Sequence, residues 1–282
     1  MSVQPPSPTP AQSRSNRTTV IVLVVIAVIL AVIAALLLQN VARHRQGAAA
    51  TSQAATSTTS AAAATSAAEP TPAPPVPDAQ TLELIRSETH RDPVDAQAKG
   101  KVDAPVVMVV YSDFACPYCT QFAQKVEPEL ADLVAQGTLR VEWRDLAQIS
   151  PTSPLAAQAG RAAAKQGKFW EFHDAVYAAA DPQGHPEYTE DSLVAFAKKA
   201  GVADIDRFRT DMNAAETVSA VTEAKEHAHS IGITGTPFMI VGETFISGYQ
   251  DAEYMKAVIN SQAAKVKTSD TSKTSAAPTA TR

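Results

Sequence analysis

The only two cysteines in this chain of 282 residues, Cys116 and Cys119, lie in one tetrapeptide, Cys-Pro-Tyr-Cys. Two cysteines are too few for the several disulfides that hold small secreted folds together, and too few for a four-cysteine zinc site. Two randomly placed cysteines would have this spacing in only about 1 of 100 such chains, so accident explains it poorly. The folded part of the chain must therefore be stabilised by its apolar core, and the cysteine pair indicates chemistry.

A predicted strand precedes the tetrapeptide, and a predicted helix follows it. The strand is Val106–Ser112, a short β-branched apolar run of the kind found in buried central strands. Apolar residues recur at helical spacing from Gln121 to Gln136, and Gly137 ends that pattern. A pair of cysteines between a strand and a helix is typical of a redox site.

The positions of the two cysteines relative to the start of the predicted helix predict different roles for them. Cys116 is expected to be exposed at the helix N-terminus, where backbone N–H groups and the helix dipole favour a thiolate. Cys119 lies one turn further along and should be more buried, and Pro117 suits the first helical turn. We therefore predict that Cys116 is the nucleophile of thiol–disulfide exchange and that Cys119 resolves the mixed disulfide.

Two other interpretations of the cysteine pair stay open from the residues alone. A static disulfide is one, although so short a loop adds little stability. A zinc or copper half-site is the other, with possible help from four residues of one predicted helix. Those residues are Glu223, Glu226, His227 and His229.

The remaining pattern predicts an α/β fold with an inserted helical subdomain at about residues 151–230. The expected elements are a strand at Leu139–Leu146, helices across Pro154–Ser230 with breaks at Asp181–Pro186 and Gly201, a hairpin of Phe238–Val241 and Thr244–Ile246, and a helix at Ala252–Ala264. A second feature supports redox chemistry. Thr236-Pro237 directly precedes the hairpin, and a cis bond there would place the backbone of Thr236 where an extended substrate could pair with it.

The flanks of this domain, residues 78–267, have a different composition. An unbroken apolar run of nineteen residues at 20–38 would extend about 28 Å as a helix, close to the thickness of a bilayer core, and predicts a transmembrane anchor after a disordered segment at 1–19. A cleaved signal peptide, with Ala48 and Ala50 at the cleavage site, is the alternative. Residues 39–77 form an Ala/Ser/Thr/Pro-rich linker, and residues 268–282 a tail expected to be disordered. The net charge of −5 argues against nucleic acid as a partner.

Four stretches of the domain resemble the DsbA-like thiol–disulfide oxidoreductases, which have a thioredoxin fold with a helical insertion. They are Asp103–Val107, Tyr111–Cys119, Gln166–His173 and Gly232–Phe238, in the family's order. The combination of this domain with an apolar run before it is similar to the membrane-anchored members of the family in Gram-positive bacteria. The resemblance implies Cys116 as nucleophile, Cys119 as resolving thiol and Pro237 as a cis-proline beside them, with Pro117, Tyr118 and Thr236 contacting substrate.

The same resemblance implies a setting for the protein. The catalytic domain would be extracytoplasmic on the plasma membrane, with the N-terminus inside, since a catalytic disulfide needs an oxidising compartment. Its partners would be secreted or cell-envelope proteins with free thiols and a quinone-linked membrane reoxidase. We expect a monomer that uses no metal and no organic cofactor.

One departure leaves the direction of the reaction open. The best-known oxidases of the family have Pro-His between the cysteines, whereas this chain has Pro117-Tyr118. Tyrosine cannot supply the positive charge that helps to stabilise the thiolate, so we expect a less oxidising couple. A disulfide isomerase or reductase on the same fold, or a thiol-based metal-binding chaperone module, is the alternative function.

Several further residues have predicted roles, mostly structural. Asp113 is expected to cap the active-site helix. Glu142 is expected to be an exposed charge on an alternating strand, with assistance of proton transfer to Cys119 as the less favoured role. The aromatic residues of the insertion should form its core, and His173 should be a packed or surface histidine. Those aromatic residues are Phe169, Trp170 and Phe172.

Overall fold

The computed structural model describes residues 74–275, with side chains described up to residue 268. The predicted segment at 1–19, the predicted anchor at 20–38 and the linker up to residue 73 lie outside the described residues. Within residues 74–275, no helix combines the length and the apolar character needed to cross a membrane.

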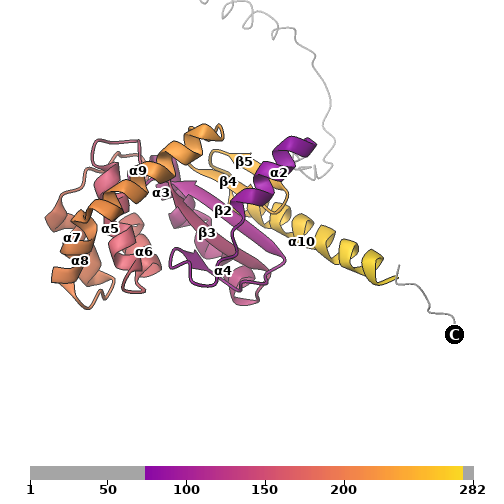
Figure 1. Ribbon diagram of the computed structural model, residues 1–282, viewed down its shortest axis with the longest axis horizontal. Helices are drawn as coiled ribbons and strands as arrows, with labels where there is room; N and C mark the ends of the chain where they lie inside the picture. Colours follow the sequence, from indigo (N-terminus) through magenta and orange to yellow (C-terminus); the bar gives the residue numbers. More distant parts are fainter. Residues whose placement is uncertain (1–73, 276–282) are drawn as a thin grey trace, which may run out of the picture. The chain divides into compact units, whose positions relative to one another are not determined.

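A five-stranded sheet in the order β1-β3-β2-β4-β5 forms the centre of the domain (Figure 1). The two middle strands, β2 and β3, are parallel, and the other neighbouring pairs are antiparallel. The strands are β1 (Ala98–Lys99), β2 (Val106–Ser112), β3 (Leu139–Asp145), β4 (Phe238–Val241) and β5 (Thr244–Ser247). The predicted strands and hairpin are therefore present, and β1 is an additional short edge strand that has too few residues to show alternation.

Every residue of β2 is buried, because both faces of the sheet are covered by helices. Alternate residues Val106, Met108 and Val110 pack with helices α4 (Glu127–Ala135) and α10 (Ala252–Ser275) on one face. On the other face, Val107, Val109 and Tyr111 pack in a cluster that includes residues of α2 (Ala79–Glu88) and α9 (Ala215–Ser230). The continuous apolar run of β2 thus reflects burial on two sides.

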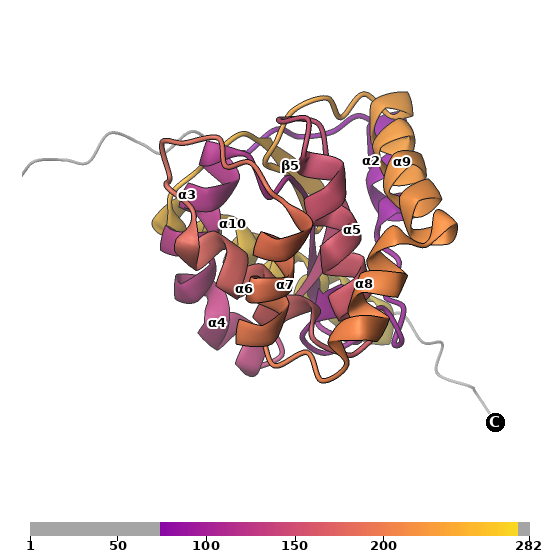
Figure 2. The same ribbon diagram turned by 90° about the vertical axis from the view of Figure 1, so that its left-hand side faces the viewer.

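The predicted helical insertion lies between β3 and β4, and Figure 2 shows its helices facing the viewer. It consists of α5 (Ser153–Ala164), α6 (Phe169–Ala179), α7 (Glu190–Lys199), α8 (Ile205–Asn213) and α9. The predicted breaks fall between helices, since Asp181–Pro186 separates α6 from α7 and Gly201 lies between α7 and α8. The fold is a thioredoxin-like α/β fold with an inserted helical subdomain.

Two helices differ from the sequence prediction. The single helix expected up to Gln136 is divided at Val126 into α3 (Pro117–Lys125) and α4. The reason is Pro128, which has no N–H to continue the helical ladder and clashes with the preceding turn. The tail expected to be disordered from residue 268 is helical up to Ser275, because no glycine or proline interrupts α10 before Pro278.

Helix α2 was not predicted, and it shows where the linker joins the domain. Asp78 caps the helix by accepting the Thr81 N–H at 2.8 Å. Just before it, the Pro75 carbonyl accepts a hydrogen bond of 2.7 Å from the Thr244 hydroxyl on β5. The chain therefore enters the domain beside the turn of the β4–β5 hairpin.

Candidate active site

Cys116 occupies the N-cap position of α3, directly after the loop that follows β2. Its backbone is extended (φ −86°, ψ 122°), and its carbonyl accepts the Thr120 N–H at 2.9 Å. Pro117 is the first residue of the helix, where a missing N–H leaves no bond unmade. The Cys116 sulfur therefore lies at the positive end of the helix dipole, as predicted.

Both cysteines are free thiols, and each is only 2% exposed. The prediction of an exposed Cys116 is therefore wrong. The loop before β4 lies against it, and the Cys116 thiol donates a hydrogen bond of 3.4 Å to the Thr236 carbonyl. Of the Cys-Pro-Tyr-Cys segment, Tyr118 is the residue that faces solvent, with 58% of its surface exposed.

The two thiols differ in acidity. A hydrogen bond from the Cys119 thiol lowers the pKa of Cys116 to about 6, against the effect of burial, and Thr236 and the N–H groups of Cys119 and Tyr118 lower it further. Burial, and then the bond to Cys116, raise the pKa of Cys119 well above its ordinary value. At neutral pH Cys116 is thus mostly a thiolate and Cys119 a thiol. Because the lowered pKa belongs to the folded state, it stabilises the reduced protein above the unfolded pKa, and this stability is lost as the pH falls through about 6.

The Thr236–Pro237 peptide bond is cis, so the structure brings together both halves of the predicted site. The Thr236 hydroxyl is buried and has no hydrogen-bond partner among the described residues while Cys116 is a thiol. It acts on Cys116 as a hydrogen-bond donor that lowers the pKa. The Thr236 carbonyl is therefore the partner of the Cys116 thiol, and the Thr236 hydroxyl is the partner of the thiolate.

We expect Thr236→Val to raise the pKa of Cys116 from about 6 towards the ordinary thiol range, because the variant removes a donor to the thiolate and keeps the shape of the side chain. Titration of the thiolate absorbance in the reduced protein measures this pKa. Thr234→Val is the matched control, because Thr234 is exposed and only its carbonyl makes a bond, to Gln148. An unchanged midpoint in Thr236→Val, or an equal rise in both variants, would contradict this role.

Asp113 does not cap α3, contrary to the prediction. It is 2% exposed, and its carboxylate accepts four hydrogen bonds in the loops around it. The donors are the N–H groups of Ala115, Gln148 and Ile149 and the hydroxyl of Ser153, at 2.7–2.8 Å. Asp113 thus holds the loop before Cys116 against the loop after β3.

Glu142 is neither an exposed charge nor a partner of Cys119, so both predicted roles are wrong. It is completely buried. Its carboxylate accepts hydrogen bonds of 2.8 Å from both Arg140 and Arg144, which lie two positions before and after it on the same face of β3. Trp143, the residue between them, packs in the same cluster as Cys119, so Glu142 points to the opposite face of the sheet.

Two of the three aromatic residues predicted to form the core of the insertion do so, whereas Trp170 is only partly buried and packs against that core. Phe169 and Phe172 are buried in the cluster that contains both cysteines. His173 is 1% exposed, and its Nε2 lies 3.5 Å from Glu127 Oε1. Although burial opposes it, the charge of Glu127 raises the pKa of His173, so the histidine belongs to a buried ion pair.

The two histidines of α9 do not converge on a common point. His227 Nε2 lies 3.0 Å from Glu88 Oε1, and His229 Nε2 lies 2.7 Å from Gln148 Oε1. Among residues 74–268, no group of three or more His, Cys, Asp or Glu side chains is placed to hold a metal ion. The surroundings of His227 and His229 therefore give no support to the alternative interpretation as a zinc or copper site.

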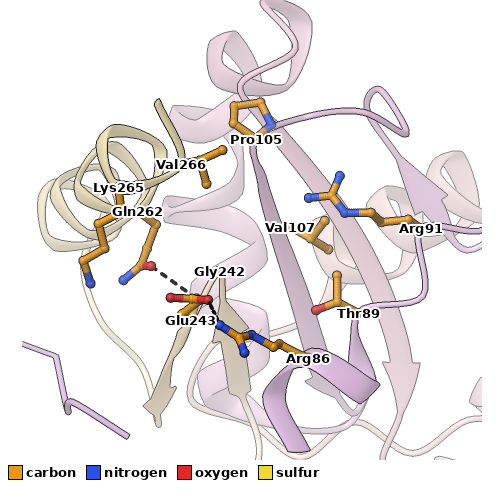
Figure 3. A pocket seen from close by; sticks show the side chains of 10 residues that line it. All are labelled: Arg86, Thr89, Arg91, Pro105, Val107, Gly242, Glu243, Gln262, Lys265 and Val266. Atoms are coloured by element: carbon orange, nitrogen blue, oxygen red, sulfur yellow. Dashed lines mark hydrogen bonds and ion pairs between the residues drawn. The ribbon is translucent and has the colours of Figure 1, made fainter. Parts of the chain in front are cut away.

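A cleft of about 600 Å³ lies elsewhere, between α2, the hairpin turn and α10 (Figure 3). Glu243 lies near its centre, paired with Arg86 at 2.5 Å, and its N–H donates to Gln262 at 3.2 Å. Pro105 and Val107, at the start of β2, contribute to its lining. The cleft is therefore at the end of the sheet opposite to Cys116 and is not part of the active site.

Comparison with known proteins identifies the domain. A family model described as Thioredoxin matches residues 94–261, more than half of the chain. The chain is 30% identical over 173 residues to a probable disulfide bond formation protein D of Bacillus cereus, an alignment that covers 60% of this chain and 79% of that protein.

The chain is also 32% identical over 173 residues to the Na(+)/H(+) antiporter NhaA 3 of Salinispora tropica. That alignment covers 60% of this chain but 25% of the antiporter, so the chain spans about a quarter of that relative's length. The likeness concerns this one domain.

Two solved structures have the same fold. The oxidised BdbD of Bacillus subtilis matches with a TM-score of 0.55 and 23% identity, over 59% of this chain and 92% of that one. A thioredoxin-like oxidoreductase of Silicibacter pomeroyi matches with a TM-score of 0.52 and 26% identity, over 62% and 95%. The chain belongs to the thioredoxin family, and within it to the DsbA-like thiol–disulfide oxidoreductases.

Proposed function

We propose that this protein catalyses disulfide formation in secreted and cell-envelope proteins, with Cys116 and Cys119 as its redox couple. The observation that carries the proposal is the position of Cys116, which is held at the start of α3 with a pKa of about 6, against a buried Cys119 whose pKa is raised. A thiolate of lowered pKa at a helix N-terminus is the arrangement that thiol–disulfide exchange requires.

The reaction begins from the oxidised couple. A substrate thiolate attacks the Cys116 sulfur, the Cys116–Cys119 bond breaks, and Cys119 leaves as a thiolate that takes up a proton. A second substrate thiolate then attacks the substrate sulfur of the mixed disulfide, and Cys116 leaves. The lowered pKa of Cys116 makes it a good leaving group in this step. The substrate gains a disulfide, the enzyme gains two electrons, and a quinone-linked membrane partner reoxidises it.

Residues around Cys116 support a role in binding an extended substrate. Tyr118, two residues after Cys116, is largely exposed, and Ile149, whose N–H donates to Asp113, is partly exposed. The Thr236 carbonyl bonds to Cys116 in the free protein. We assign Pro117, Tyr118 and Thr236 to the substrate contact, in which strand-like pairing along Thr236 would place a substrate cysteine beside Cys116.

The proposed location is the outer side of the plasma membrane, with the N-terminus inside. The apolar run at 20–38 has the length of a membrane span, and the linker at 39–77 separates it from the domain. The chemistry supports this placement, because a catalytic couple that forms disulfides works in an oxidising compartment.

The residues of the active-site loop favour a redox couple that is less oxidising than the couples of the strongest oxidases. Tyr118 brings no positive charge, and a Cys116 pKa of about 6 is closer to the value near 7 of thioredoxin than to the value near 3.5 of DsbA. A reductase or isomerase is therefore the second candidate. Equilibration with glutathione separates them, since a reduction potential near about −120 mV supports an oxidase and one near about −270 mV a reductase.

We expect Cys119→Ala, expressed as the full chain in a bacterium, to accumulate mixed disulfides between Cys116 and exported proteins. The variant keeps the nucleophile and removes the thiol that resolves the intermediate. Non-reducing gels and mass spectrometry identify the trapped proteins.

The double variant Cys116→Ala/Cys119→Ala is the control, and it should trap none. Loss of the adducts on adding reductant shows that they are disulfides. Trapped proteins that are mainly cytoplasmic would contradict the proposed location. An absence of adducts from a well-expressed, folded variant would contradict the exchange itself.

A further inference from the structure

Two buried hydroxyl groups form a hydrogen-bonded chain that ends on the active-site loop. The Ser112 hydroxyl, at the end of β2, lies 3.0 Å from the Tyr177 hydroxyl of α6. The Tyr177 hydroxyl donates to the Asp113 carbonyl at 3.0 Å. The same carbonyl accepts the Cys116 N–H at 3.0 Å, so the chain ends on the active-site loop. Ser112 is 4% exposed and Tyr177 2% exposed.

The chain lies at the group whose charge changes during the reaction. Tyr177 packs with Cys119 in one buried cluster, and Ser112, its hydrogen-bond partner, acts on Cys119 as a donor that lowers the pKa which burial raises. Cys119 must become a thiolate each time it attacks or leaves, although it is only 2% exposed. A buried thiolate needs a donor, and a thiol needs an acceptor.

The other titratable groups near this chain are already engaged. They are Cys116 on α3, Asp113 in the loop, His173 on α6 and Tyr188 before α7. The Asp113 carboxylate accepts four hydrogen bonds, His173 pairs with Glu127, and the Tyr188 hydroxyl donates to the Phe114 carbonyl at 2.8 Å. Among the described residues, Ser112 and Tyr177 are thus the groups that can turn with the charge on Cys119.

We propose that Ser112 and Tyr177 form a reversible hydroxyl relay, which solvates the Cys119 thiolate during disulfide exchange; this inference rests on the proposed function. With a thiol at Cys119, Ser112 donates to Tyr177, and Tyr177 donates to the Asp113 carbonyl. With a thiolate, Ser112 donates to the Cys119 sulfur and Tyr177 donates to Ser112. The Asp113 carbonyl then keeps the Cys116 N–H as its donor.

The relay moves no proton between residues, because each hydroxyl keeps its own hydrogen and only rotates. When Cys119 attacks a mixed disulfide on Cys116, its S–H bond and the mixed S–S bond break. The Cys116–Cys119 bond forms, the released sulfur leaves as a thiolate, and the proton passes to water. In this relay Ser112 donates to the reacting sulfur, whereas Tyr177 acts through Ser112 and is a positioning residue.

The test uses reduced protein and the aromatic disulfide dithiobis(nitrobenzoate) in a stopped-flow instrument. Attack by Cys116 releases the first nitrobenzoate thiolate, and attack by Cys119 on the resulting mixed disulfide releases the second. The pH dependence of the second phase reports the pKa of Cys119. The variants are Ser112→Ala and Tyr177→Phe, which remove single hydroxyl groups.

The matched control is Tyr188→Phe. Tyr188 is also buried, and its hydroxyl also donates to a backbone carbonyl of the same loop, but no bond joins it to Ser112 or Cys119. A merely structural role of these hydroxyls would therefore affect Tyr188→Phe and Tyr177→Phe alike.

We expect Ser112→Ala to lower the ratio of second-phase to first-phase rate constants about 10-fold, because the loss of a hydrogen bond to a charged group typically changes a rate by about that factor. The pH profile of the second phase should move to higher pH, because the pKa of Cys119 rises. Tyr177→Phe should lower the ratio about 3-fold in the same direction, and Tyr188→Phe should leave it unchanged. Unchanged ratios and pH profiles in both relay variants, or an equal fall in Tyr188→Phe, would overturn the proposal. This readout is independent of protein substrates, so normal nitrobenzoate kinetics together with a Cys119→Ala variant that trapped no exported protein would contradict the proposed function alone.

Discussion

Replacement of Cys116 by serine is expected to lower the rate of disulfide exchange by on the order of 10⁴-fold or more, the size of effect seen when an enzyme loses its nucleophile. The serine hydroxyl is not ionised at neutral pH, whereas the Cys116 thiol has a pKa of about 6. Cys119 cannot substitute for it, because the pKa of Cys119 is raised well above the ordinary value. The measurement is the rate at which each protein, supplied with oxidised glutathione, forms disulfides in a reduced, unfolded protein.

Cys119→Ser provides the comparison that separates the two thiols. With dithiobis(nitrobenzoate), reduced wild-type protein should release two thiolates per molecule, Cys119→Ser one, and Cys116→Ser none on the same timescale. Circular dichroism of each variant checks that the fold is kept. Substantial exchange by Cys116→Ser would show that Cys119 is reachable, and it would refute the assigned order of attack.

Replacement of Glu142 by alanine is expected to destabilise the domain by about 3–5 kcal/mol, the range for removing one partner of a buried ion pair. The variant leaves Arg140 buried with an uncompensated charge, although Arg140 also donates to the Asp92 carbonyl at 2.5 Å. It also removes the acceptor of the His90 and Arg91 N–H groups. Denaturant unfolding of the reduced protein measures the difference.

The effect should also depend on pH. Burial opposes ionisation of Glu142, but the bond from Arg140 and the charge of Arg144 outweigh it, so its pKa is lowered. The stabilisation is thus complete above the unfolded pKa and is lost as the pH falls through the lowered one, so the difference between wild type and Glu142→Ala should narrow in acid. Glu129→Ala is the control, since Glu129 pairs with Lys256 on the surface. Equal stability of both variants would contradict a structural role of the buried cluster.

Local patterns allowed much of the fold to be predicted. The strand Val106–Ser112 has the same bounds in the structure as in the prediction, because its burial on both faces appears in the sequence as an uninterrupted apolar run. The hairpin and the helix start at Pro117 were likewise visible from neighbouring residues. Each of these features depends on interactions within a few positions of the chain.

The environment of the charged and hydroxyl residues could not be predicted in the same way. The alternation on β3 correctly indicates that Glu142 faces away from Trp143, but an alternating pattern gives no sign that the polar face is covered. The groups that cover it, His90 and Arg91, are more than fifty positions away. The bond between Ser112 and Tyr177 joins residues 65 positions apart, so no local motif marks it. Hydrogen-bond partners that are this far apart in the sequence are identified only when the structure shows how the insertion packs against the sheet.

The hydrogen bond between Pro75 and Thr244 has a mechanical consequence. It places the junction with the linker beside the turn of the β4–β5 hairpin, whereas Pro237 and Cys116 lie at the other end of β4. A force transmitted through the linker would therefore act on the end of the sheet remote from the reacting sulfur atoms. The mechanical load from the linker would fall on the hairpin and not on the redox couple, so the reactive end of the domain would stay free to meet substrates.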